Sequence, residues 1–295
     1  MPIQWFPGHM TKARRVLADS MPKQDVVIEV LDARMPGASE NPVLAELRGQ
    51  KACVKVLSKS DLADPLVTSA WVAALTRDVP KTVAVALTTD NPGETRRKIA
   101  AICQSLVVRS ARSEKPIRAV IVGIPNVGKS TLINTLMNRK VAKTGDEPAV
   151  TKSAQVAVLA SGVVLTDHPG LMWPNVSDDR ASLCLALGGA IPDTALDFEV
   201  VALFAAKFFL EHYGALLRAR YGFDTLPETP EDLLDAIGRK RGGLRSGGRV
   251  DRHKAADVLV HDFRTGKLGR ISLQRPRSMM PRAAPPVDEP VDDEG

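Results

Sequence analysis

The sequence has few aromatic residues and few cysteines, and each shortage excludes a class of protein. Phenylalanine, tryptophan and tyrosine make up 4% of the 295 residues, which argues against an aromatic-rich β-sandwich. The three cysteines lie at positions 53, 103 and 184, so no pair has the spacing of a zinc site or of a redox motif. We expect buried thiols in a reducing cytosol.

Long apolar runs are also missing. No stretch approaches about 18 residues without a charge, which argues against a membrane-spanning helix. Residues 1–6 lack the basic and then apolar pattern of a signal peptide, so we expect a cytoplasmic protein. The chain does contain 44% apolar and 25% charged residues, which is typical of a globular protein with a sizeable core, and its length suits about two domains.

Basic residues are concentrated in one part of the chain. Lysine and arginine number 40 against 34 aspartates and glutamates, which gives a net charge of +6. Residues 239–282 alone hold 13 basic and three acidic residues, a local balance of +10. Residues 281–295 form a proline-rich tail with five acidic residues, and this tail is predicted to be disordered.

Short apolar runs rich in valine and isoleucine alternate with helical stretches in the first part of the chain. The runs are near-continuous, as strands of a parallel sheet covered on both faces require. The predicted strands cover 26–31, 52–57, 82–87, 119–122, 155–159 and 163–166, and the predicted helices cover 41–48, 66–75, 95–106 and 129–137. This alternation predicts an α/β domain over 1–176 with a doubly wound, mostly parallel sheet.

Beyond residue 179 the strand-type runs disappear. Amphipathic helices are predicted over 195–213, 214–221, 230–238 and 252–265, with a flexible loop over 239–252. We therefore predict a second, small all-helical domain over 177–280, which contains nearly all of the basic stretch 239–282.

Residues 123–130, Gly-Ile-Pro-Asn-Val-Gly-Lys-Ser, match the P-loop pattern G-x-x-x-x-G-K-[ST] between a predicted strand and a predicted helix. In this pattern backbone N–H groups surround the phosphates, Lys129 reaches the β- and γ-phosphates, and Ser130 offers its hydroxyl to Mg²⁺. The alternative is a glycine turn with a surface lysine. The predicted nucleotide-binding residues of this loop are Asn126, Val127, Gly128, Lys129, Ser130 and Thr131, and Lys129 is also a catalytic candidate.

A second phosphate-binding motif, Asp-His-Pro-Gly, ends the predicted strand 163–166. Asp167 is the candidate for a further Mg²⁺-linked acid, and Gly170 for a backbone N–H that faces the γ-phosphate. Thr151 lies between the two motifs, in a polar stretch that would become ordered when γ-phosphate and metal are present. The predicted Mg²⁺ ligands are thus Ser130, Thr151 and Asp167.

Residues 58–61, Ser-Lys-Ser-Asp, follow another predicted strand and are similar to the guanine-reading pattern Asn-Lys-x-Asp. The Asp61 carboxylate would accept two hydrogen bonds from the N–H edge of guanine, while the stem of Lys59 covers the base. Adenine has a lone pair where guanine has N1–H, so Asp61 would reject adenine. Ser58 replaces the asparagine, which leaves the strictness of guanine selection open. We predict that the nucleotide is contacted by all four residues, Ser58, Lys59, Ser60 and Asp61. The alternative is that this segment is only a solvated turn at the end of a strand.

The order of these motifs is unusual. In Ras-like GTPases the P-loop precedes the base-reading loop, whereas here Asp61 precedes Gly123. The chain therefore resembles a circularly permuted GTPase, in which each motif still ends a strand. Together with this order, the segments 3–10 (Ile-Gln-Trp-Phe-Pro-Gly-His-Met), 31–36 (Leu-Asp-Ala-Arg-Met-Pro) and 167–174 (Asp-His-Pro-Gly-Leu-Met-Trp-Pro) resemble the ribosome-biogenesis GTPase A (RbgA/YlqF) family.

The resemblance covers nearly the whole chain, from residue 3 to about residue 275. It implies a cytoplasmic enzyme that binds and hydrolyses GTP with Mg²⁺ in a late step of large (50S) ribosomal subunit assembly, and whose helical domain contacts ribosomal RNA. It also implies that Asn126 helps to hold a K⁺ ion near the phosphates. Thr88 and Thr89 stand where the family has a second base-contacting Ser-Ala pair, so Thr88 is a further nucleotide-binding candidate. We expect a monomer.

The resemblance further implies a catalytic role for His9. Leu171 occupies the place of the water-orienting glutamine of Ras-like enzymes, and an apolar side chain cannot position water. A substitute is needed, and His9 lies on an N-terminal segment able to swing in when a ribosome is bound. Without the family, His9 is better interpreted as a surface histidine beside Trp5 and Phe6.

The basic stretch suits contacts to a phosphate backbone, because aromatic side chains for base stacking are scarce in it. The alternative is a solvated basic face without a partner. Two other functions stay open: an RNA-binding assembly factor whose nucleotide pocket only switches binding, and a metabolic P-loop ATPase. The predicted RNA-binding residues are Arg239, Lys240, Arg241, Arg245, Arg249, Arg252 and Lys254.

Overall fold

The computed structural model describes residues 8–88, 91–107, 115–137, 156–159, 162–168, 170–172, 178–192, 197–243 and 249–279. The predicted tail, 281–295, lies outside these residues, as do Thr89, Thr151 and Arg245. The helix that carries His9 is described as backbone at that position, without its side chain.

A six-stranded sheet forms the centre of the first part of the chain. Its strands are β1 (Val26–Asp32), β2 (Ala52–Ser58), β3 (Thr82–Ala86), β4 (Ile117–Val122), β5 (Val156–Val158) and β6 (Val163–Asp167). They are arranged in the order β3-β2-β1-β4-β6-β5, and all neighbours are parallel except β5 and β6. The predicted α/β class with a doubly wound, mostly parallel sheet is confirmed.

Strand β5 departs from the parallel arrangement. It forms a hairpin with β6, in which the Leu159 N–H donates to the carbonyl of Val163 and the Gly162 N–H donates back to Leu159. Gly162 has a φ of +78°, which a residue without Cβ adopts at little cost. The connection is too short for the crossover that a parallel neighbour needs, so the pair is antiparallel.

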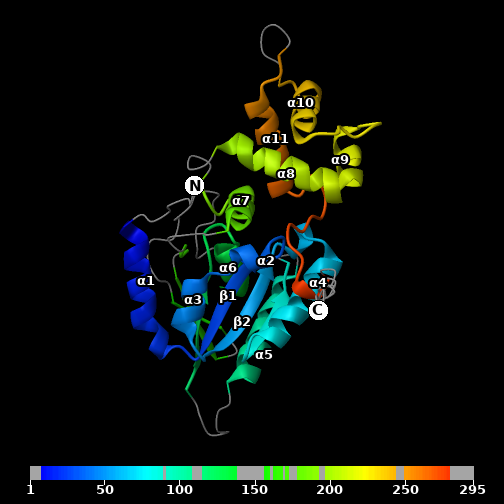
Figure 1. Cartoon of the computed structure of the whole chain (residues 1–295). Helices are drawn as coiled ribbons and strands as arrows, with labels where there is room; N and C mark the ends of the chain where they lie inside the picture. The colour runs from blue at the N-terminus through cyan, green and yellow to red at the C-terminus, as the bar shows by residue number, and fades with distance from the viewer. Residues whose placement is uncertain are drawn as a thin grey trace, which may run out of the picture.

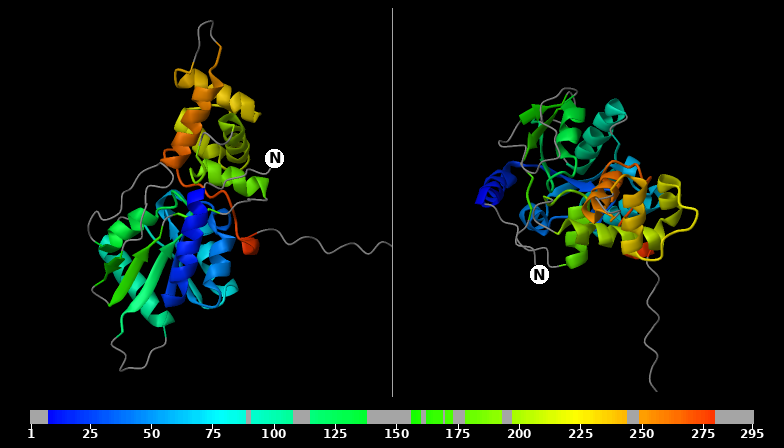
Figure 2. Two further views of the ribbon diagram at one scale, coloured as in Figure 1. Left: turned by 90° about the vertical axis from the view of Figure 1, so that its left-hand side faces the viewer. Right: turned by 90° about the horizontal axis from the view of Figure 1, so that it is seen from above.

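Helices cover both faces of this sheet, with α1 and α3 on one side and α5 and α6 on the other (Figure 2). Asn41, Asp64 and Asn91 each cap a helix by accepting a backbone N–H, and each is followed by proline at the first helical position. The bounds are α1 (Gly8–Ser20), η1 (Met21–Lys23), α2 (Pro36–Ser39), α3 (Pro42–Arg48), η2 (Ser60–Leu62), α4 (Pro65–Asp78), α5 (Pro92–Leu106) and α6 (Lys129–Met137).

The rest of the described chain is helical and stands at the end of the sheet where the parallel strands finish (Figure 1). Its elements are α7 (Asp179–Leu187), α8 (Phe198–His212), α9 (Gly214–Tyr221), α10 (Pro230–Lys240), α11 (Arg252–Arg264) and η4 (Arg277–Met279). The predicted loop over 239–252 is shorter than expected, because α10 continues to Lys240 and α11 begins at Arg252. One buried apolar cluster continues from the sheet into these helices.

Among the described residues, no single helix is long and apolar enough to cross a bilayer. Helices α8 and α9 reach the required length and composition only when taken together, and the chain bends by 109° between them.

The cysteines match their prediction. Cys53, Cys103 and Cys184 are free and buried. Burial raises the pKa of each thiol to about 12, so none is a thiolate at neutral pH.

Candidate functional site

The P-loop pattern forms a tight turn between β4 and α6. Gly123 has a φ of +151°, and a Cβ there would lie 2.6 Å from the carbonyl oxygen of Val30, so only glycine fits. Asn126 also has a positive φ, of 55°, which turns the loop before α6 begins at Lys129. The loop therefore directs backbone N–H groups and a helix N-terminus toward one point, the arrangement that binds phosphate.

Lys129 and Asp167 are both buried, and the charge of each affects the pKa of the other. Burial lowers the pKa of Lys129 to about 8, against the opposing charge of Asp167, and its Nζ donates to the carbonyl of Ile124 at 2.7 Å. Burial likewise raises the pKa of Asp167 to about 6, with Lys129 opposing. A triphosphate would bring negative charge to the lysine and favour its charged form.

The Asp167 carboxylate suits a divalent cation. Asp167 ends β6 and is 3% exposed, and within the described residues its Oδ2 atom has no hydrogen-bond partner. A buried carboxylate oxygen without a donor is costly unless a ligand completes it. Ser130 is the second residue of α6, which follows β4, and β4 pairs with β6, so the two predicted Mg²⁺ ligands follow adjacent strands. Hydroxyl and carboxylate oxygens are the ligands that Mg²⁺ prefers.

The segment after Asp167 is held against the P-loop. A Cβ on Gly170 would lie 3.0 Å from the Pro125 nitrogen and 3.1 Å from Lys129 Nζ, so its backbone approaches the loop closely. The Leu171 N–H donates to the Gly123 carbonyl at 3.2 Å, and the side chain of Leu171 is buried. An apolar, buried Leu171 agrees with the expectation that it does not orient water.

The base-reading loop lies directly against the P-loop. Ser58 ends β2, and its hydroxyl contacts two carbonyl oxygens, of Leu31 at 3.0 Å and of Val127 in the P-loop. Lys59, at a φ of +53°, extends its Nζ to 2.8 Å from the carbonyl oxygen of Asn126. Lys59 and Asn126, which are 67 residues apart in sequence, thus bring the two loops together at the carboxyl edge of the sheet.

The two loops share one pocket of about 180 Å³. Both motifs contribute to its wall, and so does the segment after β3, which includes Thr88. The residues of this base pocket are Val56, Ser58, Lys59, Asp61, Leu87, Thr88, Thr95, Gly128, Thr131, Leu132 and Thr135.

Several wall residues of the base pocket were missed from the sequence. Thr95 lies in the first turn of α5, and Thr135 lies one helical turn after Thr131 on α6. The i, i+4 spacing of the α6 threonines was the available signal. Thr95 gave none, because nothing in a single sequence shows that α5 passes the base-reading loop. Ser60 is half-buried in η2, outside the pocket wall.

The helix that carries His9 begins at the same end of the molecule. Helix α1 leads through η1 directly into β1, so it runs opposite to that strand and starts at the sheet's carboxyl edge (Figure 1). An ion pair of 3.7 Å between Arg14 and Glu46 joins α1 to α3. The role of His9 stays a prediction.

The predicted RNA-binding residues separate into two groups. Three are engaged within the helical part: Lys240 donates to the Gly222 carbonyl, Arg241 Nη2 donates to Arg220 at 3.3 Å, and Arg252 pairs with Asp235 at 2.9 Å. Arg239, Arg249 and Lys254 are exposed. Their RNA contacts stay a prediction.

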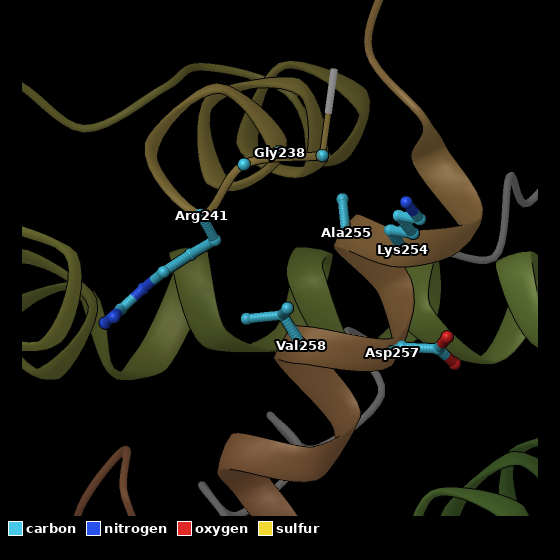
Figure 3. Close-up of a pocket in the computed structure, with 8 residues that line it drawn as sticks. Gly238, Arg241, Lys254, Ala255, Asp257 and Val258 are labelled. Atoms are coloured by element: carbon cyan, nitrogen blue, oxygen red, sulfur yellow. The ribbon is translucent and has the colours of Figure 1, made fainter. Parts of the chain in front are cut away.

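A basic groove follows one face of α11. Its first part, of about 270 Å³, lies where Gly238 of α10 faces Ala255, between Arg241 and Lys254 (Figure 3). Its second part, of about 580 Å³, shares Arg241 and continues along the helix. The basic side chains of the whole groove are Arg220, Arg241, Lys254, His261, Arg264 and Lys267. Asp257 and Asp262 also line it, and Asp262 pairs with Arg220. Four of the basic residues were not among the predicted RNA-binding residues, because Arg220 lies in α9 and the other three follow the predicted cluster, at 261–267.

Comparison with known proteins gives consistent matches. A family model described as "50S ribosome-binding GTPase" matches residues 118–191. A Bacillus cereus protein named Ribosome biogenesis GTPase A is 41% identical over 283 residues, covering 94% of this chain and 95% of that protein. Two solved YlqF structures are similar as well: a GDP-bound one (TM-score 0.65, 25% identity, 89% of this chain and 99% of that chain) and a GNP-bound crystal structure from Thermotoga maritima (TM-score 0.63, 26% identity, 90% of this chain and 99% of that chain).

Proposed function

The chain belongs to the ribosome biogenesis GTPase A family, and from this premise we propose that it hydrolyses GTP to drive a late step in assembly of the large (50S) ribosomal subunit, which stimulates the reaction. The observation that carries the nucleotide part is the shared base pocket, in which Lys59 Nζ lies 2.8 Å from the Asn126 carbonyl oxygen. The base-reading and phosphate-binding loops can therefore hold the two ends of one GTP molecule.

Nucleotide selection is assigned to the base-reading loop. Asp61 accepts two hydrogen bonds from the guanine N–H edge, and the Lys59 stem covers the base. Ser58 lacks the amide of the usual asparagine, but its hydroxyl contact with Val127 supports a comparable bracing of this loop against the P-loop. Selection of guanine over adenine then depends on Asp61, because adenine would leave its carboxylate without a donor.

Phosphate chemistry is assigned to the P-loop and to Asp167. The loop N–H groups and Lys129 hold the β- and γ-phosphates, and Ser130, Asp167 and Thr151 hold Mg²⁺. When bound, Mg²⁺ neutralises charge that develops on the phosphate oxygens. The Gly170 N–H faces the γ-phosphate, so the segment after it senses whether that phosphate is present.

The attacking water needs a partner that Leu171 cannot supply. We assign this role to His9, brought in when the subunit orders the N-terminal segment. The position of α1, which begins at the carboxyl edge of the sheet, supports this assignment. Asn126 is assigned to binding a K⁺ ion. Its Nδ2 donates to the Gly189 carbonyl at 2.8 Å. The amide oxygen, which is the atom that would bind a cation, therefore points away from Gly189.

RNA contact is assigned to the helical part, including the predicted residues Arg239, Arg249 and Lys254. The basic groove supports this proposal, since its cations follow a helix face as phosphate contacts require. The protein is expected to act in the cytoplasm as a monomer that meets the subunit.

Two measurements test this proposal. GTP turnover with and without purified large subunits, at high K⁺ concentration, should show strong stimulation; a lack of stimulation would favour a passive nucleotide switch. Sedimentation through sucrose gradients should show the protein with large subunits in a GTP analogue and largely free in GDP. Equal sedimentation in both nucleotides would contradict the coupling of binding to hydrolysis.

A further inference from the structure

Asp32 and Arg34 form a buried ion pair at the end of β1 that no step assigned above uses. Both residues are 1% exposed. Arg34 Nε donates to Asp32 Oδ1 at 2.9 Å and Nη2 donates to Oδ2 at 2.8 Å, so the contact is bidentate. The backbone N–H of Arg34 donates to the same carboxylate at 3.0 Å. A buried pair of this quality fixes the position of both groups.

Asp32 reaches the base pocket through Lys59. Lys59 Nζ lies 3.0 Å from Asp32 Oδ2 and 2.8 Å from the Asn126 carbonyl oxygen, so one ammonium group joins the ion pair to the P-loop. Burial alone would raise the pKa of Asp32, but the charges of Arg34 and Lys59 outweigh it and hold the pKa well below its ordinary range. The carboxylate is therefore charged at neutral pH.

Arg34 reaches in the opposite direction, into the helical part. Its Nη1 donates to the carbonyl of Phe263 in α11 at 3.3 Å, and its guanidinium lies 4.4 Å from the centre of the Phe263 ring. Its own carbonyl accepts the N–H of Leu273 at 2.7 Å. One arginine thus holds both α11 and the chain that follows it.

The chain after α11 also contacts the base-reading loop. The Ile271 N–H donates to the carbonyl of Leu62 at 3.0 Å, and the Asp64 N–H donates to the Ser272 hydroxyl at 3.1 Å. This segment descends from α11 onto the first part of the molecule (Figure 2). The helical part is therefore attached at the two ends of the base-reading loop, at Lys59 through the ion pair and just beyond Asp61 through the backbone.

We propose that Asp32 and Arg34 are positioning residues that act through Lys59 and couple occupancy of the base pocket to the docking of α11. The proposal rests on the proposed function, because it assumes that a guanine nucleotide fills this pocket. A nucleotide that fixes Lys59 also favours the Asp32–Arg34 geometry, and this geometry favours the contacts to Phe263 and Leu273. Linkage makes the effect reciprocal: a partner that displaces α11 weakens nucleotide binding by the same factor.

The test compares hydrogen exchange and GDP affinity in three full-length proteins. In the unsubstituted protein, GDP should slow exchange in peptides that cover 252–275, which contain the Leu273 N–H, by about tenfold. Arg34→Met keeps the apolar stem and removes the charge; it should lose this GDP effect and bind a fluorescent GDP about tenfold more weakly. The matched control, Arg48→Met, removes an arginine whose Nη1 donates to the Lys51 carbonyl at 2.9 Å; among the described residues Arg48 contacts neither Lys59 nor α11, so both properties should be kept.

Each outcome either supports or overturns the proposed coupling between the base pocket and α11. Arg34→Met with unchanged GDP affinity and a retained GDP effect on exchange would overturn the proposal, as would an unsubstituted protein that binds GDP without any effect on 252–275. If Arg34→Met does not fold, Arg34→Lys replaces it: this change keeps the charge but loses the fork that reaches both Asp32 and Phe263, and should weaken the coupling. An unsubstituted protein that binds no GDP would instead refute the proposed function.

Discussion

Replacing Lys55 by methionine should destabilise the fold in a strongly pH-dependent way. Lys55 and Glu29 face each other in the register of β2 and β1, and both lie in the middle of the sheet. Lys55 Nζ is 3.4 Å from Glu29 Oε2 and also bonds Glu40; the side chains of Lys55, Glu29 and Glu40 are 2%, 6% and 33% exposed. Replacing Lys55 leaves the buried Glu29 carboxylate and the neighbouring Glu40 carboxylate without a cation.

The size of the effect follows from this burial. Breaking a buried ion pair costs about 3 to 5 kcal/mol, and we expect the lower value, about 3 kcal/mol near pH 8, because Glu40 keeps some hydration. Burial already raises the pKa of Glu29, with Lys55 opposing, so Lys55→Met raises it further. A carboxyl group with a raised pKa in the folded state binds a proton on folding. The loss should therefore shrink as the pH falls, by up to about 1.4 kcal/mol per pH unit.

Urea unfolding followed by circular dichroism at about pH 8 and about pH 6 measures this loss. Lys98→Met is the matched control: Lys98 pairs with Glu94 at 2.6 Å but is half exposed, so its loss should be small and similar at both pH values. The double change Glu29→Gln and Lys55→Met should recover part of the stability, because it removes the stranded charge. A loss for Lys55→Met that is equal at both pH values would refute the reasoning.

Three further predictions concern the site and the basic groove. Lys129→Ala should abolish GTP binding while the circular dichroism spectrum is retained, and calorimetric titration checks it; detectable micromolar affinity would contradict the P-loop assignment. His9→Ala should leave GTP affinity unchanged and reduce turnover stimulated by large subunits by about 100-fold; normal stimulated turnover would remove His9 from the mechanism. Lys267→Glu should weaken sedimentation with large subunits in a GTP analogue, whereas Lys207→Glu, exposed on α8 and outside the groove, should not.

The sheet was largely predictable because its strands are apolar on both faces and because α3, α4 and α5 begin at side-chain caps. The strand over 155–159 was predicted and corresponds to β5, but its antiparallel direction was not predicted, since a run of valine and alanine carries no direction. The pairing of Glu29 with Lys55 was also not predicted. Each charge lies in an apolar run, and only the register of two strands 26 residues apart brings them together.

The site was predictable where a motif fixes both the backbone and the chemistry. Gly123, Lys129 and Asp167 occupy the places that the P-loop and Asp-x-x-Gly patterns require. The coupling of Asp32 and Arg34 to α11 was not predictable, although the segment 31–36 was recognised, because Phe263 lies 229 residues away from Arg34 in sequence. Contacts of that range are set by how the helical part packs and leave no local signal.

We propose that one guanine nucleotide joins the base-reading loop to the P-loop, and competition binding tests this most directly. Unlabelled GTP should displace a fluorescent GTP analogue at concentrations at least about 100-fold below those of ATP, because only guanine satisfies Asp61. Asp61→Asn should bring xanthosine triphosphate, which offers an acceptor where guanine offers its amino group, above GTP in the same assay. Equal displacement by GTP and ATP, with no change on Asp61→Asn, would contradict the account.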